Sequence, residues 1–135
     1  MSKNMKLNPI GIIHTPYKRI EDAPRQGSML NDISEIEIFK EYMNGLKDIE
    51  SWQHLIILYW LDKAKRDTLL TVSSFDSRIH GVFAVRSPHR PNPIGLAVVD
   101  LIEVKGNVLR IRGIDAVDGT LVIDIKPYYA EIDRR

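Results

Sequence analysis

The sequence predicts a compact, mostly antiparallel β-barrel with one or two short helices. With 135 residues, 44% of them hydrophobic and 27% charged, the chain has the length and composition of one soluble globular domain. About seven short segments of strand character follow one another closely, and almost no stretch is helical in pattern. The chain contains no internal repeat, low-complexity tract or long linker. We therefore expect residues 1–135 to form a single all-β domain.

The first third of the chain is expected to supply two strands, a polar loop and a short helix. Residues 6–13 predict a strand with Pro9 at an edge or a bulge, because proline has no N–H to donate to a neighbouring strand. Residues 14–29 mix proline, glycine and charged side chains, which predicts an irregular loop. Residues 34–39 alternate isoleucine with glutamate, the pattern of a half-buried strand, and a short helix is expected over residues 40–46.

Three apolar segments in the middle of the chain are expected to be core strands. They cover residues 54–61, 68–73 and 81–85, and they are rich in β-branched and aromatic side chains. The longest has eight residues, which is too short to cross a bilayer as a helix. The polar start of the chain is not followed by the apolar segment of a secretory signal. We therefore expect a cytoplasmic protein with no membrane partner.

A long hairpin and a last strand are expected toward the carboxyl end. Residues 95–104 and 108–114 flank a short turn that contains glycine and asparagine. Asp118-Gly119 is a second turn, and residues 121–125 form the last strand. Leucine and isoleucine occupy the odd-numbered positions of this strand, so we expect them on one apolar face and Asp124 on the opposite face.

Missing residue types exclude several kinds of protein. The chain has no cysteine, which excludes disulfides, thiolate zinc sites, iron–sulfur clusters and a cysteine nucleophile. Its four histidines lack the spacing of a metal site, so we expect no metal. No glycine-rich phosphate loop follows a strand, which argues against a Rossmann cofactor domain. No Gly-x-Ser-x-Gly motif supports a hydrolytic triad.

The densest polar motif is the run Arg-Ser-Pro-His-Arg-Pro-Asn-Pro-Ile-Gly at residues 86–95. Each proline fixes its own φ and restricts the residue before it, so this loop is stiff. A stiff backbone that carries Arg86, His89 and Arg90 is preorganised for an anion such as a carboxylate or a phosphate. A rigid connector with solvated arginines, or a proline-rich peptide ligand, would explain the same residues.

Two further polar segments and a basic stretch accompany this loop. Pro24-Arg25-Gln26-Gly27 is a second candidate ligand loop, and a plain surface turn explains it about as well. Asp124 and Lys126 suit either a ligand or a mutual ion pair. The net charge is only +1, yet residues 63–90 hold six basic side chains against two acidic ones. This excess fits either a solvated face or contacts with nucleic-acid phosphates.

Taken together and in this order, the motifs resemble the TsaA/TrmO family over about residues 9–128. The resemblance implies a β-barrel methyltransferase that uses S-adenosylmethionine without a Rossmann fold. It implies methylation of N6 of threonylcarbamoyladenosine beside the tRNA anticodon, with the anticodon loop as the binding partner. It also implies a homodimer with the cofactor near the subunit interface.

The resemblance assigns cofactor contacts to three segments and several single positions. Arg90 and Lys126 are expected at tRNA phosphates, and Arg86 at the cofactor carboxylate or the RNA. Asp124 or His89 is the candidate base for the proton that the attacking nitrogen loses. Two alternatives remain open: a non-catalytic module that binds S-adenosylmethionine or another nucleotide, and a methyltransferase with a different substrate. The cofactor contacts implied are Pro24, Arg25, Gln26, Gln53, His54, Arg86, Leu96, Asp118, Gly119, Thr120 and Leu121.

Overall fold

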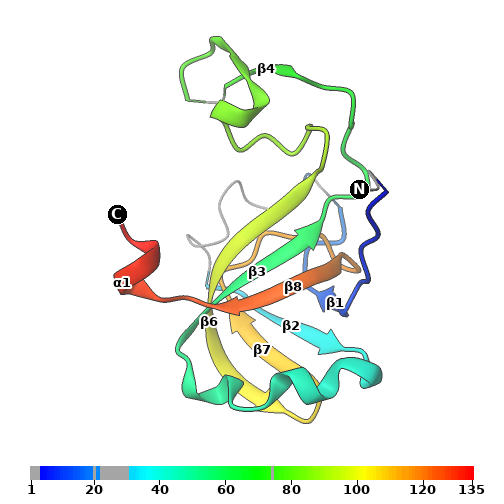
Figure 1. The fold of residues 1–135 in the computed structure, drawn as a ribbon, viewed down its shortest axis with the longest axis vertical. Helices are drawn as coiled ribbons and strands as arrows, with labels where there is room; N and C mark the ends of the chain where they lie inside the picture. The colour runs from blue at the N-terminus through cyan, green and yellow to red at the C-terminus, as the bar shows by residue number, and fades with distance from the viewer. Residues whose placement is uncertain (1–3, 20, 22–30, 74) are drawn as a thin grey trace. The chain divides into compact units, whose positions relative to one another are not determined.

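The computed structural model describes residues 4–19, 21, 31–73 and 75–135 (Figure 1). The chain divides into two compact units, and each is described by itself. The barrel unit consists of Met1–Tyr59 and Leu96–Arg135, and the lobe consists of Trp60–Gly95.

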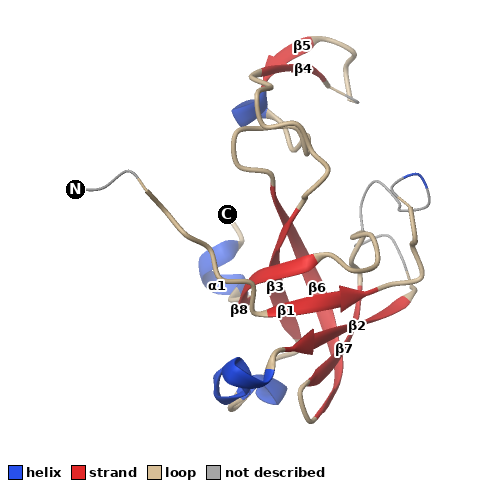
Figure 2. Cartoon of the chain, turned by 90° about the vertical axis from the view of Figure 1, so that its right-hand side faces the viewer, coloured by secondary structure: helices blue, strands red, loops and turns tan. Residues whose placement is uncertain are grey.

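Six strands of the described residues close into a barrel in the order β1-β2-β7-β6-β3-β8 (Figure 2). β1 pairs antiparallel with β2 and β8, and β7 pairs antiparallel with β2 and β6. Closure gives each of these six strands a neighbour on both sides. The predicted antiparallel β-barrel is therefore confirmed. Its strands are β1 (Gly11–His14), β2 (Ile33–Ile38), β3 (His54–Trp60), β6 (Ile94–Lys105), β7 (Val108–Arg112) and β8 (Leu121–Pro127).

The barrel core is made by side chains at every second position of the strands. β2 buries its even-numbered residues from position 34 to 38 and turns Glu35 outward, as the isoleucine–glutamate alternation predicted. β3 buries its odd-numbered residues in the same way. Apolar side chains on neighbouring strands thereby face one another across the interior. The most deeply buried members are Ile13, Ile36, Ile38, Leu55, Ile57, Val99, Leu109, Ile111 and Val122.

A bulge in β8 changes which of its residues face the core. Leu58 lies opposite Asp124, whereas the next residue, Tyr59, lies opposite Val122. The extra residue between these pairs shifts the alternation by one position. Val122 is fully buried, whereas Leu121 is exposed. The expectation that the odd-numbered residues of this strand share the buried face was therefore wrong.

The helical segments are short and lie at the surface. η3 (Lys40–Leu46) and η4 (Ile49–Ser51) are 3₁₀ helices, and the first occupies the predicted residues. A single α-helical turn, α1 (Ala130–Asp133), follows β8. β1 begins at Gly11 rather than at residue 6, since residues 4–10 form no described strand. In the described part of the chain, no helix is long and apolar enough to cross a membrane.

The lobe contains a small two-stranded sheet and a 3₁₀ turn. β4 (Leu70–Val72) pairs antiparallel with β5 (Ile79–Gly81), and η5 (Val82–Ala84) follows. Two predicted core strands are thus corrected. The segment 68–73 supplies a three-residue strand outside the barrel, and most of 81–85 is helical turn. The physical reason is that an apolar, β-branched run reports a preference for extended backbone but not what will cover it.

Candidate functional site

A tight turn at the start of β8 is held against the end of β1. The N–H groups of Asp118 and Gly119 donate to the carbonyls of Tyr17 and Ile13, at 2.7 and 2.8 Å. The Ile13 N–H donates to the Thr120 carbonyl at 2.8 Å. Gly119 has a φ of +90°, a conformation that favours glycine. The predicted turn is confirmed, and these bonds fix its backbone in place.

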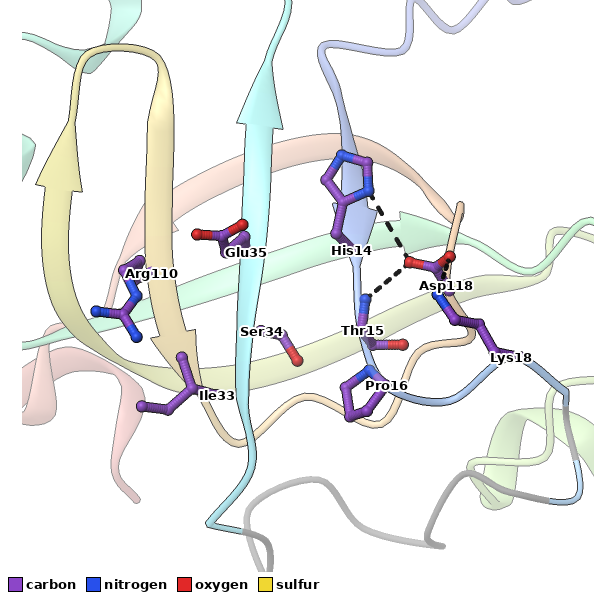
Figure 3. A pocket seen from close by; sticks show the side chains of 9 residues that line it. All are labelled: His14, Thr15, Pro16, Lys18, Ile33, Ser34, Glu35, Arg110 and Asp118. Carbon is purple, nitrogen blue, oxygen red and sulfur yellow. Dashed lines mark hydrogen bonds and ion pairs between the residues drawn. The ribbon is translucent and has the colours of Figure 1, made fainter.

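The Asp118 carboxylate has a partner at each oxygen (Figure 3). Oδ1 accepts the Thr15 N–H at 3.0 Å, and Oδ2 accepts the Lys18 ammonium at 2.8 Å. The His14 Nδ1 lies 3.9 Å from Oδ1. The hydrogen bond from Lys18 is the largest of the causes that lower the pKa of this carboxyl group. Asp118 therefore stays ionised at neutral pH and ties the turn to residues 14–18.

A shallow depression of about 420 Å³ adjoins this turn on the barrel unit. Its charged groups are evenly divided, with Lys18 and Arg110 against Glu35 and Asp118. Figure 3 shows Glu35 and Arg110 side by side on β2 and β7, where their Cα atoms are paired in register. Both cations already have an anionic partner, because Lys18 is paired with Asp118 and Arg110 with Glu103. The lining residues are His14, Thr15, Pro16, Lys18, Ile33, Ser34, Glu35, Arg110 and Asp118.

Two more of the predicted cofactor residues, Gln53 and His54, lie at the start of β3. The Gln53 carbonyl accepts the Leu101 N–H at 2.9 Å, and the His54 Nδ1 lies 3.0 Å from the Asp100 carboxylate. The His54 ring packs edge-on against Tyr128. β3 pairs with β8 so that its first residues lie opposite the end of β8 and Tyr59 lies opposite Val122.

The barrel unit therefore does not bring Gln53 and His54 next to the turn at Asp118. Tyr59 lies five positions along β3 from His54, about 16 Å at roughly 3.3 Å per residue. Leu96 lies on β6 and is exposed. Pro24, Arg25 and Gln26 lie outside the described residues.

The proline loop, residues 86–95, is held in place by hydrogen bonds from two arginine side chains of the lobe. The Arg90 guanidinium donates to the carbonyls of Val82, Val85 and Ser87 at 2.8–3.1 Å. Arg66 donates to the Pro91 carbonyl and the Asn92 side chain, and its guanidinium lies over the Trp60 ring. The stiffness expected from the prolines is thus reinforced by side-chain contacts across the lobe.

The two arginines of the loop differ in what they contact. Arg86 is exposed, and it makes no hydrogen bond or ion pair with any residue that the structure describes. Arg90 has its guanidinium directed at three carbonyl groups, so its predicted contact with RNA phosphate stays a prediction. Of the pair, Arg86 is the one whose donors face solvent.

The two candidate bases are both engaged. The His89 Nδ1 accepts the Lys65 N–H at 2.9 Å, so the neutral ring carries its proton on Nε2 and is a donor there. The Asp124 Oδ1 accepts the Ile125 N–H, and its Oδ2 lies 3.3 Å from the Lys126 ammonium. The ion pair that the sequence allowed for Asp124 and Lys126 is thus present. The basic role of either residue, and the RNA contact of Lys126, stay predictions.

Sequence reasoning missed two buried tyrosines of the barrel unit. Tyr17 donates to the Asp32 carboxylate and Tyr59 to Asp115, each at 2.7 Å. Burial is the largest cause that raises the pKa of Tyr17 to about 12, and burial also raises the pKa of Tyr59. Both phenols therefore keep their protons at neutral pH. No spacing in the sequence signals these pairs, because their members come from different elements.

The described residues form a closed β-barrel and a small two-stranded sheet, and not the parallel sheet of a Rossmann domain. The chain belongs to the TrmO family, since the family model described as tRNA-methyltransferase O N-terminal domain matches residues 12–134.

Three relatives are similar to this chain in sequence, and one solved structure is similar to it in fold. Two proteins of Archaeoglobus fulgidus align over 96% of this chain. One, a "Probable S-adenosyl-L-methionine-binding protein", is 59% identical, and 35% of its own length is covered. The other, an "S-adenosyl-L-methionine-binding protein", is 54% identical, with 93% covered. The human "tRNA (adenine(37)-N6)-methyltransferase" is 33% identical over 96% of this chain and 31% of its own length.

The crystal structure of TrmO from Pseudomonas aeruginosa matches with a TM-score of 0.82 and 30% identity. The match covers 98% of this chain and 59% of that one. The chain thus spans about a third of the first Archaeoglobus relative and under two thirds of the solved TrmO protein.

Proposed function

We propose that this chain is an S-adenosylmethionine-dependent methyltransferase that acts on N6 of the adenosine beside the tRNA anticodon. Threonylcarbamoyladenosine is the proposed form of that nucleoside. The observation that carries the proposal is the family match over residues 12–134, joined by 33% identity to a human enzyme named for this position and atom. S-adenosylmethionine is the proposed cofactor, in keeping with the names of the Archaeoglobus relatives.

The donor set of the chain fits this cofactor. The bound cofactor would supply an activated methyl group on a sulfonium centre, beside a carboxylate and an ammonium group. Arg86 has a solvent-facing guanidinium with no partner among the described residues, which suits bidentate contact with the carboxylate. The same charge placed against the sulfonium would repel it, so any contact of Arg86 with the cofactor is expected at the amino-acid end.

The turn at Asp118 has a different proposed role from the one its carboxylate suggests. Both carboxylate oxygens are satisfied by Thr15 and Lys18. We therefore assign Asp118 the task of holding the turn, whose Gly119 and Thr120 N–H groups also bond within the barrel unit, to the carbonyls of Ile13 and Val117. Orientation of two reacting groups is worth up to about 7–11 kcal/mol, so a fixed turn is itself a catalytic asset.

A homodimer with the cofactor near its interface is part of the proposal. Gln53 and His54 lie about 16 Å along β3 from the level of the turn at Asp118, at roughly 3.3 Å per residue. Two copies can bring these two groups together, one from each subunit. Apolar side chains stand exposed on the outside of β6 and β8, including Leu96, Val98 and Leu121. A second copy would cover such a surface.

The test is methyl transfer to defined RNA. The purified chain is incubated with methyl-labelled S-adenosylmethionine and tRNA from a strain that lacks this methylation, and nucleosides are analysed by mass spectrometry. We expect one methyl group on the adenosine next to the anticodon, and none on tRNA without the threonylcarbamoyl group. Transfer to both tRNAs would contradict the finer substrate assignment alone.

Two arginine variants of the lobe, one at Arg86 and a matched control at Arg78, test the cofactor site. Arg86→Ala should weaken cofactor binding at least tenfold in calorimetry, on the order of 1.4 kcal/mol. Arg78→Ala should leave it unchanged, because Arg78 is an exposed arginine of the same lobe whose partner is Asp76.

The second candidate is a non-catalytic module that binds S-adenosylmethionine. The 54% identical Archaeoglobus relative favours it, because that protein is covered over 93% of its length and is named for cofactor binding alone. Cofactor binding without transfer to any RNA would select this function. Absence of cofactor binding would reject both.

A further inference from the structure

The backbone on both sides of Arg86 is held by one side chain. The Arg90 Nη1 donates to the carbonyl of Val85 at 3.1 Å and to that of Ser87 at 2.8 Å. Its Nη2 donates to the Val82 carbonyl at 2.8 Å. Val85 and Ser87 are the chain neighbours of Arg86. A single part-buried guanidinium therefore fixes the backbone from which Arg86 projects.

Residues 89–91, which carry Arg90, are themselves held by hydrogen bonds to residues 65 and 66. The Arg90 N–H donates to the Lys65 carbonyl at 3.1 Å, while the Lys65 N–H donates to the His89 Nδ1 at 2.9 Å. Arg66 holds the Pro91 carbonyl at 2.9 Å. Residues 89–91 are thus fixed to residues 65 and 66, and Arg90 carries this rigidity on to residues 82–87.

The contacts of Arg90 require arginine rather than any cation. The guanidinium is planar and offers donors in a fixed fork, so that it can reach three carbonyl groups at once. A lysine ammonium supplies the same charge from one point on a flexible stem. A phosphate contact, in contrast, is served by either cation with a modest loss.

We propose that Arg90 is a positioning residue that aims Arg86 at an oxyanion of the ligand and makes no phosphate contact itself. The proposal rests on the function proposed above. The oxyanion is the carboxylate of the cofactor or a phosphate of the RNA, which share their recognition by a guanidinium.

Arg90→Lys and Arg90→Ala test this role in the chain of residues 1–135. Affinity for S-adenosylmethionine is measured by calorimetry, and affinity for tRNA by titration at several salt concentrations. Arg90→Lys should lose affinity at least tenfold, as Arg90→Ala does, although it keeps the charge. Loss for the cofactor alone identifies its carboxylate as the oxyanion, whereas loss for tRNA with a flatter salt dependence identifies a phosphate.

Coupling to Arg86 separates positioning from general damage. Adding Arg86→Ala to either Arg90 variant should cause less than a twofold further loss, because Arg86 is already misdirected. Arg78→Lys is the matched control and should behave as the wild type. Melting curves check that each variant is folded. If the alanine variant is not, Arg90→Gln replaces it, since its planar amide keeps two N–H donors, and it should bind at least as well as Arg90→Lys.

Three outcomes are distinguishable. Wild-type affinity of Arg90→Lys for both ligands, or additive losses with Arg86→Ala, would overturn the positioning role and leave the proposed function standing. A wild-type protein that binds neither S-adenosylmethionine nor tRNA would instead overturn the proposed function.

Discussion

The barrel unit and the lobe are built from similar residues, yet they bury them in opposite ways. β3 has leucine or isoleucine at four of its seven positions, and the two strands of the lobe carry Leu70, Val72 and Ile79. Ile57 on β3 is 0% exposed, whereas Ile79 on β5 is 70% exposed. In the barrel, closure supplies a neighbour for every inward side chain. A two-stranded sheet has no second layer of its own, so the same side chains remain at its surface.

The largest expected difference between the two units comes from truncating matched isoleucines. Ile57→Ala should lower the free energy of unfolding by about 2–5 kcal/mol, because it leaves a cavity in a packed core. Ile79→Ala should change it by under about 0.5 kcal/mol. Urea denaturation of both variants checks this. Equal losses would mean that the face of β5 is covered in solution, and a loss that grows with protein concentration would assign the cover to a second copy.

The next effect separates two glycines. A Cβ at Gly11 would lie 2.5 Å from the Glu37 backbone oxygen, whereas a Cβ at Gly81 would meet nothing within 4 Å. Gly11→Ala should therefore cost about 1–3 kcal/mol by forcing β1 away from β2. Gly81→Ala should be neutral or slightly stabilising. Thermal melting distinguishes them, and an unchanged melting temperature for Gly11→Ala would refute the close approach of the two strands.

A smaller effect should appear as the pH falls. Hydrogen bonds lower the pKa of Asp118 in the barrel unit and of Asp76 in the lobe. At pH values above the usual carboxyl pKa of 3.8, each ionised carboxylate therefore stabilises the folded structure around it. This stabilisation is lost as the pH falls from 3.8 through the lowered pKa of the folded state. The melting-temperature gap between the wild type and Asp118→Asn should close in acid.

Asp76 supplies the comparison within the lobe. Asp76→Asn should alter only local hydrogen exchange in the lobe, since the partners of its carboxylate, Arg78 and His80, both lie within four residues of it. A melting-temperature gap for Asp118→Asn that stays constant with pH would contradict the role assigned to Asp118.

The smallest expected effect concerns two buried serines. The Ser34 Oγ in the barrel unit has no hydrogen-bond partner among the described residues, whereas the Ser73 Oγ in the lobe accepts the Phe75 N–H at 3.0 Å. Ser34→Ala should be neutral or should stabilise by under about 1 kcal/mol, because it removes an unsatisfied polar group. Ser73→Ala should destabilise by about 0.5–1.5 kcal/mol. Denaturant midpoints compare the two, and a clear loss for Ser34→Ala would reveal a partner for its hydroxyl.

What could be predicted from the sequence is the part of the fold that depends on local pattern. The alternation at residues 34–39 located β2 to within one residue at each end, and the apolar run from His54 located β3. Burial in the lobe could not be predicted in this way, because β-branched residues favour extended backbone whether or not another layer covers them. The burial of Val122 could not be predicted either, because the position of a bulge depends on the partner strand.

In the candidate site, too, the features that depend on local sequence could be predicted, whereas contacts between distant residues could not. The stiffness of the proline loop followed from the restricted φ of its residues. The contacts of Asp118 with Thr15 and Lys18 join residues 103 and 100 positions apart, and no local pattern announces them. The internal use of Arg90 was also hidden, because composition cannot separate an arginine that faces solvent from one that holds carbonyl groups.

The place of the lobe in the strand order has one more consequence. β3 and β6 are adjacent in the barrel, and the lobe is the connection between them. Inside the lobe, the Leu61 N–H already bonds to the Pro93 carbonyl, as the first rung of an ordinary hairpin would. The residues Trp60–Gly95 therefore occupy the position of a loop that is usually only a few residues long. Because the lobe stands where a loop would, a change in its length need not disturb the hydrogen bonds between neighbouring barrel strands.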